Sequence, residues 1–251
     1  MVFISFSILS GSKSILIFKA SKTSPDPHFE ETASKCGSGD VLEALNIEIN
    51  LEPNDIESQI EKNNFGFMFA PNYHSAMKYV GPTRKKIGKR TIFNMIGPLS
   101  SPALVKRQVV GVFEKKLLKT FANALKSLDI KFAWIVNSED GLDEISPYAK
   151  TNVVQLKNGQ ISEIEIDPHA LGVNADDFKN LVGDDAKFNA DKMIKIFKGE
   201  DNDFSKAVSL NAAAGLIVGE KFSDFSEAYN YTREFILSGK TFLHLEKIQN
   251  V

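Results

Sequence analysis

The chain has 251 residues, 43% of them hydrophobic, and its 30 Lys+Arg and 32 Asp+Glu give a formal net charge of −2. This length and apolar content suffice for one large α/β domain, or for one domain with a small lobe. The near-neutral charge provides no general attraction for nucleic acid, so any anion binding must come from local clusters. The single cysteine, Cys36, excludes an internal disulfide and favours a reducing compartment.

Residues 1–20 are apolar but are interrupted by several serines and by Lys13. A membrane-spanning helix needs about 20 largely apolar residues, which this stretch does not provide. A signal peptide has positive charge before its apolar run and small residues at its cleavage site. Here no positive charge precedes the apolar run, and no clear cleavage site follows it. We therefore expect a cytoplasmic protein that is not attached to a membrane.

Regular helix signals begin near residue 34. The run 41–45 is expected to be helical and to be opened by Ser38 or Asp40. A serine between glycines at a helix start can present its hydroxyl and backbone N–H groups to an anion, although on these residues alone an ordinary helix cap is the simpler interpretation. Pro53 then predicts the first turn of an amphipathic helix over 52–62.

A β-α-β unit is predicted further along the chain. Residues 108–113 and 132–137 are apolar runs typical of buried strands, and 115–128 has the period of a helix between them. Such a unit places its two strands parallel in one sheet.

Later elements complete the predicted domain. Asn158-Gly159 favours a type I′ hairpin turn, giving an antiparallel pair of strands that is expected at a sheet edge. Asp201 or Asp203 is expected to open the second of the three helices that follow. The two hairpin strands and the three helices are expected at 152–156, 161–166, 191–197, 204–218 and 225–238.

An acidic loop follows the second predicted strand. It carries four carboxylates: Glu139, Asp140, Asp143 and Glu144. Acidic loops are commonly only solvated, but ligand sites of open α/β sheets lie at the carboxyl ends of strands. On these residues alone a solvated loop is the simpler interpretation, and a ligand site is the alternative.

The segment 64–102 has the most unusual composition. Between Pro71 and Pro98 it contains His74 and six of the chain's 30 Lys+Arg residues, and it ends on the turn sequence Gly97-Pro98. Its apolar residues are expected to face inward while the cations reach water or an anion. The sequence contains no CxxC, HExxH, Walker-type or GxSxG pattern, so zinc, P-loop and serine-hydrolase chemistry have no support.

The segment GFMFAPNYHSAMKYVGPTRKKIGKRTIFNMIGPLSSPA resembles the central part of anthranilate phosphoribosyltransferases, GFxFAPxxHxAMxxVxPxRxxLGxRTIFNxLGPLxNPA. The identities are polar and aromatic residues at fixed spacings, which an apolar period would not produce. Four other stretches extend the resemblance over almost all of 34–251: SKCGSGDVLEAL, RQVVGVF, GLDEIS and LNAAAGLIV.

This resemblance implies an α/β fold with a mainly parallel sheet flanked by helices, together with a remnant of a small helical domain. It also implies an enzyme of tryptophan biosynthesis that transfers the phosphoribosyl group of 5-phosphoribosyl 1-diphosphate (PRPP) to anthranilate, with Mg²⁺ as cofactor. No catalytic nucleophile or acid–base residue is implied, because positioning and charge stabilisation dominate such a transfer. The implied site residues are Ser34 and Ser38 for PRPP, Ala70, Pro71, His74, Arg84 and Pro98 for anthranilate, and Asp143 and Glu144 for the metal.

Residues 1–33 depart from the family pattern, because the expected GTGGD loop, NxST element and KHGN motif are not found there. A truncated or frame-shifted gene start would look like this, and a diverged amino terminus is the alternative. We expect a poorly packed segment at 1–33 and an α/β glycosyltransferase domain at 34–251, in which 64–102 is a helical substrate-binding segment. Without the GTGGD loop, little phosphoribosyl transfer is expected.

Other functions remain open at this point. A pyrimidine-nucleoside phosphorylase-like enzyme shares the expected fold, although the FAPxYHxAM and RTIFNxxGPL patterns favour the transferase. An inactive or non-catalytic relative could instead bind nucleic acid or a protein partner through the basic stretch 78–90, against which the net charge of −2 argues. The resembled family forms homodimers through its small helical domain. Because much of that domain is missing here, a family-like homodimer is less expected.

Overall fold

The computed structural model describes residues 7–8, 16–18, 36–74, 79, 83, 86 and 93–249. The strands are β1 Ser7–Ile8, β2 Leu16–Phe18, β3 Phe65–Phe67, β4 Arg107–Gly111, β5 Phe132–Ser138, β6 Thr151–Lys157 and β7 Gln160–Ile166. The α-helices are α1 Ser38–Ala44, α2 Pro53–Asn63, α3 Ala70–Tyr73, α5 Phe93–Leu99, α6 Leu118–Ser127, α7 Ala186–Phe197, α8 Asp203–Val218, α9 Phe225–Leu237 and α10 Lys240–Gln249. Three short 3-10 helices are η1 Lys115–Leu117, η2 His169–Leu171 and η3 Phe178–Leu181.

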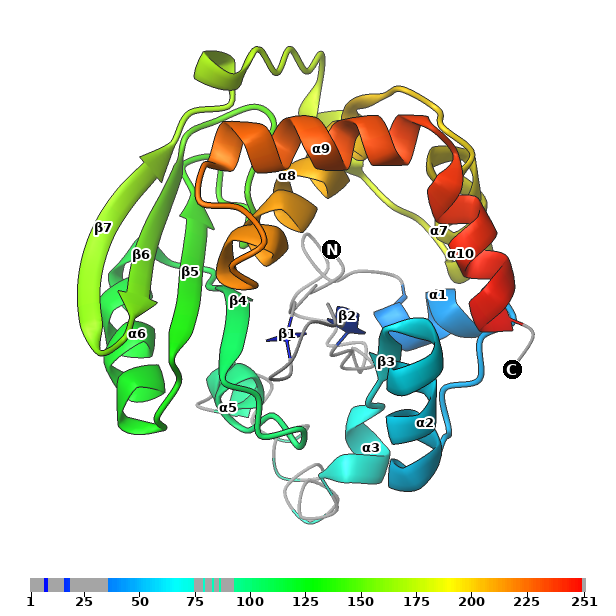
Figure 1. Ribbon diagram of the computed structural model, residues 1–251, viewed down its shortest axis with the longest axis horizontal. Helices are drawn as coiled ribbons and strands as arrows, with labels where there is room; N and C mark the ends of the chain where they lie inside the picture. Colours follow the sequence, from blue (N-terminus) through cyan, green and yellow to red (C-terminus); the bar gives the residue numbers. More distant parts are fainter. Residues whose placement is uncertain are drawn as a thin grey trace.

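The larger sheet has the strand order β1-β4-β5-β6-β7, and Figure 1 shows it on one side of the molecule with helices on both of its faces. The predicted α/β class is confirmed, including the parallel β4–β5 pair joined through α6. The expectation of a mainly parallel sheet is wrong in detail, because β1–β4, β5–β6 and β6–β7 are antiparallel. The connection from β5 to β6 contains no crossover helix, and parallel neighbours usually need one.

The hairpin between β6 and β7 forms as the sequence predicts. Asn158 has φ 49° and Gly159 has φ 78°, the two positive values that a type I′ turn requires. Strand β7 ends the sheet, so the antiparallel pair does lie at an edge.

Strand β5 is buried along its whole length, and its alternating side chains build two hydrophobic cores. Trp134 and Val136 pack in the core that includes residues of α8 and α9, whereas Ala133 and Ile135 pack in the core beneath α6. Because successive strand residues point to opposite faces, one strand supports both layers. The domain is thus three layers deep at its centre, with helix, sheet and helix stacked in turn.

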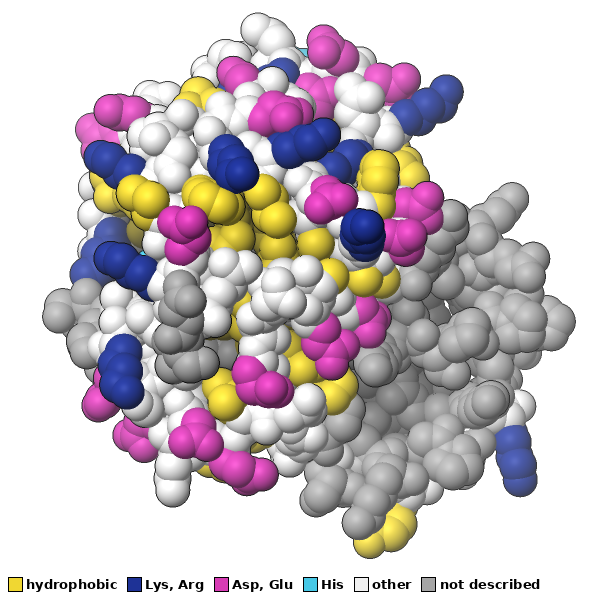
Figure 2. All heavy atoms as spheres, turned by 90° about the vertical axis from the view of Figure 1, so that its right-hand side faces the viewer, with side chains coloured by type: hydrophobic (Ala, Val, Ile, Leu, Met, Phe, Trp, Pro, Cys, Tyr) yellow, Lys and Arg dark blue, Asp and Glu magenta, His cyan; other side chains and the backbone are white. Residues whose placement is uncertain are grey.

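A lobe of helices lies beside this sheet and is built around the parallel β2–β3 pair. Its core joins α1 to the distant helices α7 and α10, through residues that include Leu45, Ala190 and Leu245. Figure 2 views the molecule from the α7–α10 side, where hydrophobic side chains show between charged ones. Phe188 of α7 and Leu243 of α10 are among the large hydrophobic residues that stay exposed.

The chain between 64 and 102 contains β3, α3 and α5 within its described residues. Gly97-Pro98 was expected to be a turn, but both residues lie in α5, which ends at Leu99. Of the segment 1–33, only β1 and β2 are described, and each pairs with a strand of the domain. None of the described helices is long and apolar enough to cross a membrane.

Helix α8 begins one residue away from either predicted cap. Asn202 is the N-cap: its side chain accepts a hydrogen bond from Ser205 N–H at 2.9 Å, and its own N–H donates to Ser205 Oγ at 3.0 Å. The flanking aspartates pair elsewhere. Asp201 forms an ion pair with Arg233 of α9, and Asp203 turns inward.

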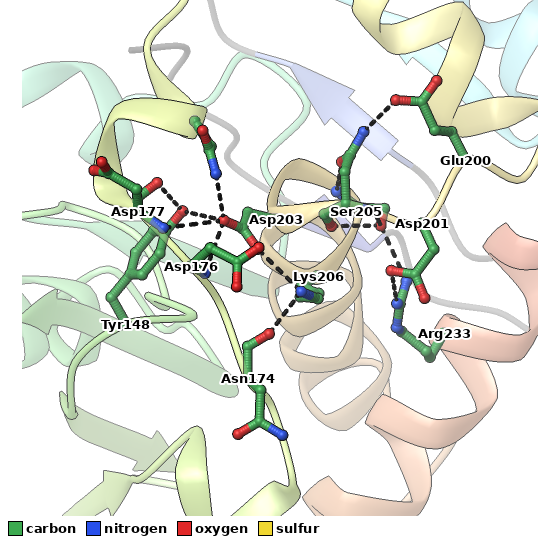
Figure 3. A network of polar contacts seen from close by, with 12 residues as sticks. Tyr148, Asn174, Asp176, Asp177, Glu200, Asp201, Asp203, Ser205, Lys206 and Arg233 are labelled. Carbon is green, nitrogen blue, oxygen red and sulfur yellow. Dashed lines mark hydrogen bonds and ion pairs between the residues drawn. The ribbon is translucent and has the colours of Figure 1, made fainter.

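Asp203 is only 3% exposed, and its carboxylate gathers several donors, as Figure 3 shows. The partners are Lys206 Nζ at 3.0 Å, Asn180 Nδ2 at 2.8 Å, Tyr148 Oη at 3.0 Å and the N–H of Asp176 at 3.0 Å. Burial alone would raise the pKa of Asp203, but the hydrogen bonds outweigh it and hold that pKa well below its usual range. One carboxylate thereby ties the start of α8 to two loops.

We predict that Asp203→Asn lowers the free energy of unfolding at pH 7 by about 2 to 3 kcal/mol, because hydrogen bonds to a charged group are lost. The pKa of Asp203 is lower in the folded than in the unfolded chain, where it is about 3.9. The stabilisation is therefore present above about pH 4 and is lost as the pH falls further. Urea unfolding of both proteins at several pH values measures the difference.

The matched control is Asp201→Asn, which breaks an ion pair whose aspartate side chain is 56% exposed. Such exposed pairs contribute about 1 kcal/mol or less. Equal losses in the two variants, or a loss from Asp203→Asn that stays the same from pH 7 down to pH 3, would contradict the role given to Asp203.

Candidate active site

The acidic loop leaves the sheet at the end of β5 and returns at the start of β6. Its four carboxylates divide into two pairs. Glu139 and Asp140 are exposed, whereas Asp143 is 9% exposed and Glu144 is half-buried. Only Asp143 and Glu144 are therefore shielded from solvent.

The loop makes its own shape through a set of short-range hydrogen bonds. Ser138 N–H donates to the carbonyl oxygen of Leu142 at 2.8 Å, and Leu142 N–H donates to Asp140 Oδ1 at 3.2 Å. Ser146 Oγ donates to the other oxygen of the Asp140 carboxylate. Asp140 thus has a structural part within the loop, which leaves Asp143 and Glu144 as the candidate ligands.

The end of β4 fits closely under this loop. A Cβ atom on Gly111 would lie 1.7 Å from the backbone oxygen of Asp143, so only glycine allows this approach. Gly111 pairs with Val136 of β5, and Val112 N–H continues the ladder to the carbonyl oxygen of Val136 at 3.0 Å. The backbone of Asp143 therefore rests directly on the carboxyl end of the parallel strand pair.

The environment of Glu144 disfavours its charge. Burial, and after it the negative charge of Asp143, raise the pKa of Glu144 to about 8. A carboxyl group in this state must lose its proton before it binds a cation.

The donor set suits magnesium. Among the described residues no cluster of three or more His, Cys, Asp or Glu residues could enclose a metal ion. Two adjacent carboxylates with hard oxygen donors match Mg²⁺, which often binds through one or two carboxylates and takes its other ligands from water and substrate phosphates.

Ser38 lies at the other candidate site, in the first turn of α1, and is 4% exposed. The sequence predicted a cap at Ser38 or Asp40. Gly37 occupies the N-cap position, and Asp40 Oδ2 accepts its N–H at 2.8 Å. Ser34 lies outside the described residues.

The residues expected to bind anthranilate are only partly described. Ala70, Pro71 and the other residues of α3 form one turn, and His74 follows it with its N–H donated to the carbonyl oxygen of Ala70 at 2.9 Å. A Cβ on Gly39 of α1 would be 3.5 Å from the ring of Phe69, the residue that precedes Ala70. The start of α1 and the start of α3 are therefore neighbours.

Pro98 belongs to the sheet side of the molecule, because Met95 and Leu99 of its helix pack against the core under α6. Arg84 lies outside the described residues. The structure thus brings the start of α1, which carries Ser38, next to Phe69 before the α3 turn, and it places Asp143 and Glu144 in sequence at the sheet end.

The sequence from 31 to 242 matches the family described as "Glycosyl transferase family, a/b domain". The chain belongs to this glycosyl transferase family. A fold of helices around a sheet with an acidic loop at a strand end is consistent with that class.

Three similar proteins are named anthranilate phosphoribosyltransferase. The anthranilate phosphoribosyltransferase of Pelagibacter ubique (strain HTCC1062) is 78% identical over 219 residues, covering 87% of this chain and 66% of that protein. The crystal structure of anthranilate phosphoribosyltransferase from Thermus thermophilus has a TM-score of 0.83 at 31% identity, covering 93% of this chain and 67% of that chain. The enzyme from Saccharomyces cerevisiae, solved in complex with PRPP and Mg, has a TM-score of 0.77 at 25% identity, covering 85% of this chain and 62% of that chain.

These matches confirm the resemblance seen in the motifs and favour it over the nucleoside phosphorylase alternative. The chain spans just under two thirds of the length of the Pelagibacter relative.

We predict that Gly111→Ala displaces the loop at Asp143 and lowers the free energy of unfolding by about 3 kcal/mol, the upper range for overpacking. The methyl group would meet a backbone atom, which cannot rotate away as a side chain could. Chemical denaturation measures the loss. A variant as stable as the parent would show that the close contact is not real.

Gly39→Ala is the matched control. Its Cβ would make only ordinary contacts, the nearest at 3.5 Å. Alanine also favours the helical conformation by up to about 1 kcal/mol, so this variant should be as stable as the parent or more so.

Proposed function

We propose that this chain forms the α/β part of an anthranilate phosphoribosyltransferase, which joins anthranilate to the phosphoribosyl group of PRPP in tryptophan biosynthesis. The observation that carries the proposal is the Asp143–Glu144 pair, fixed at the carboxyl end of β5 by the approach of Gly111. The family membership and the names of the relatives support the same reaction.

Asp143 and Glu144 would hold Mg²⁺ in this proposal. Bound there, Mg²⁺ would neutralise charge on the diphosphate leaving group. The backbone of Asp143 lies against Gly111, which fixes the point on the chain from which its carboxylate projects. The yeast relative solved with PRPP and Mg shows that a related protein binds both together.

Ser34 and Ser38 would bind PRPP. Ser38 lies in the first turn of α1, where backbone N–H groups are not used within the helix and favour an anion. Its burial orders the hydroxyl, which is suited to fixing the position of a phosphate.

Arg84 would bind the carboxylate of anthranilate, since a planar guanidinium can donate two parallel hydrogen bonds to it. His74, Ala70, Pro71 and Pro98 would line the space for the aromatic ring. Phe69, which precedes the α3 turn, packs in the same core as Val41 and Leu42 of α1, so the two substrates would meet where these elements adjoin.

This reaction demands little of the protein beyond placing its substrates. The amine of anthranilate attacks the anomeric carbon, the bond to the diphosphate oxygen breaks, and the nitrogen releases a proton to water. Effective concentration and charge stabilisation therefore supply most of the rate.

The test is the fall in anthranilate fluorescence with PRPP and Mg²⁺, for this chain and for a chimera. In the chimera, the part of the Pelagibacter relative that precedes its match to this chain replaces residues 1–33. The chimera should turn over substrate, and Asp143→Asn, Glu144→Gln and Arg84→Ala should each reduce kcat/KM about 100-fold or more. The unmodified chain should show little turnover.

Two controls lie in the same segments. Glu139→Gln removes an exposed carboxylate of the acidic loop, and Lys86→Ala removes an exposed cation two residues after Arg84. Both should retain nearly full activity. A chimera whose turnover is insensitive to Asp143→Asn and Arg84→Ala would refute the assigned sites.

A further inference from the structure

Asn211 of α8 is a buried amide in the stretch LNAAAGLIV, and neither the resemblance nor the proposed function gives it a role. It is 5% exposed, and its side chain reaches across 66 residues of sequence to the acidic loop. Asn211 Oδ1 accepts the N–H of Ile145 at 2.9 Å, and Nδ2 donates to the carbonyl oxygen of Ile145 at 3.0 Å. The second amide hydrogen goes to the carbonyl oxygen of Ala207 at 2.9 Å, within α8.

This arrangement fixes both backbone polar groups of one loop residue from one side chain. The bond to Ala207 sets the orientation of the amide plane, so Oδ1 and Nδ2 cannot exchange places without losing hydrogen bonds. The side chain of Ile145 is fully buried and packs in the same core as Leu210 and Ala214 of α8. Ile145 is therefore tied to α8 by its backbone and by its side chain.

Because Ile145 directly follows Glu144, fixing the backbone of Ile145 also restricts the backbone of Glu144. The loop is held on the other side of the acidic pair by the contact of Asp143 with Gly111 of β4. Between these two points only the Asp143–Glu144 peptide is left to adjust. The positions from which both carboxylates project are set by α8 and β4.

We propose that Asn211 is the positioning residue for the metal carboxylates: it holds Ile145 so that Asp143 and Glu144 present their oxygens to Mg²⁺ in one arrangement. This inference rests on the proposed function of that pair. Asparagine suits the position because the amide offers an acceptor and donors together. Leucine has a similar volume and offers neither, and aspartate offers only acceptors when ionised.

The test measures metal affinity directly, with Mn²⁺ as an oxygen-seeking probe followed by electron paramagnetic resonance, with and without inorganic diphosphate. Asn211→Leu should weaken Mn²⁺ binding about ten- to a hundredfold, the range found when partners that orient metal ligands are removed. Asn211→Gln keeps the acceptor and the donors of the amide and displaces them by one methylene group. This milder variant should weaken binding less, and it decides the question if the leucine variant does not fold.

Thr232→Val is the matched control for a general loss of stability. Thr232 is also buried and donates its hydroxyl to α8, at the carbonyl oxygen of Ser209, but no hydrogen bond joins it to the described residues of the acidic loop. Thr232→Val should lower the melting temperature, because a buried hydroxyl donor is lost, while leaving Mn²⁺ affinity unchanged.

The results test the positioning role of Asn211 separately from the metal site at Asp143 and Glu144. If Asp143→Asn and Glu144→Gln abolish Mn²⁺ binding while both Asn211 variants retain parental affinity, the positioning role is refuted and the metal site stands. If the parent chain binds no Mn²⁺ with diphosphate present, both fail. Hydrogen exchange of the parent adds a measurement that needs no variant: the Ile145 amide should be protected, and exchange at the rate of an exposed amide would overturn the inference.

Discussion

The acidic loop after β5 is held at two points, by β4 on one side and by α8 on the other. On one side, β4 ends in a glycine that lets the backbone of Asp143 rest on the strand. On the other, Asn211 of α8 takes both backbone polar groups of Ile145. These two contacts fix the backbone from which the carboxylates of Asp143 and Glu144 project.

Helix α8 can act as this support because it is buried on most of its surface. Its small residues Ala213 and Ala214 allow close packing on the sheet, and Thr232 of α9 donates to its backbone at Ser209. At its start, the carboxylate of Asp203 accepts hydrogen bonds from Tyr148 (Figure 3) and from Asn180 of η3. The same helix therefore holds the chain at the acidic loop and at the segments around Tyr148 and Asn180.

Features that depend on neighbours in sequence were predictable. The β4–α6–β5 unit, the hairpin at Asn158-Gly159 and the position of the acidic loop all follow from local periodicity or turn chemistry. The helix cap was misplaced by one residue, because Asn202, Asp201 and Asp203 are all good capping types and only tertiary contacts decide among them.

Features that depend on distant contacts were not predictable from one sequence. Gly111 reads as an ordinary strand glycine until the backbone of Asp143 lies over it, and Asn211 reads as one polar residue in an alanine-rich helix. The antiparallel course of β6 was missed because nothing in the loop before it distinguishes a tight return from a crossover. Helix α10 was not predicted, because it packs on α1 and α7 from across the chain.

The most direct test of this account is a crystal structure of the protein with Mn²⁺ and inorganic diphosphate. We expect an anomalous peak at about 2 Å from carboxylate oxygens of Asp143 and Glu144, from a metal ion that also binds the diphosphate. In the same map the backbone of Ile145 should keep both hydrogen bonds to the Asn211 amide. A metal bound away from the Asp143–Glu144 pair, or bound there only after Ile145 has left Asn211, would contradict it.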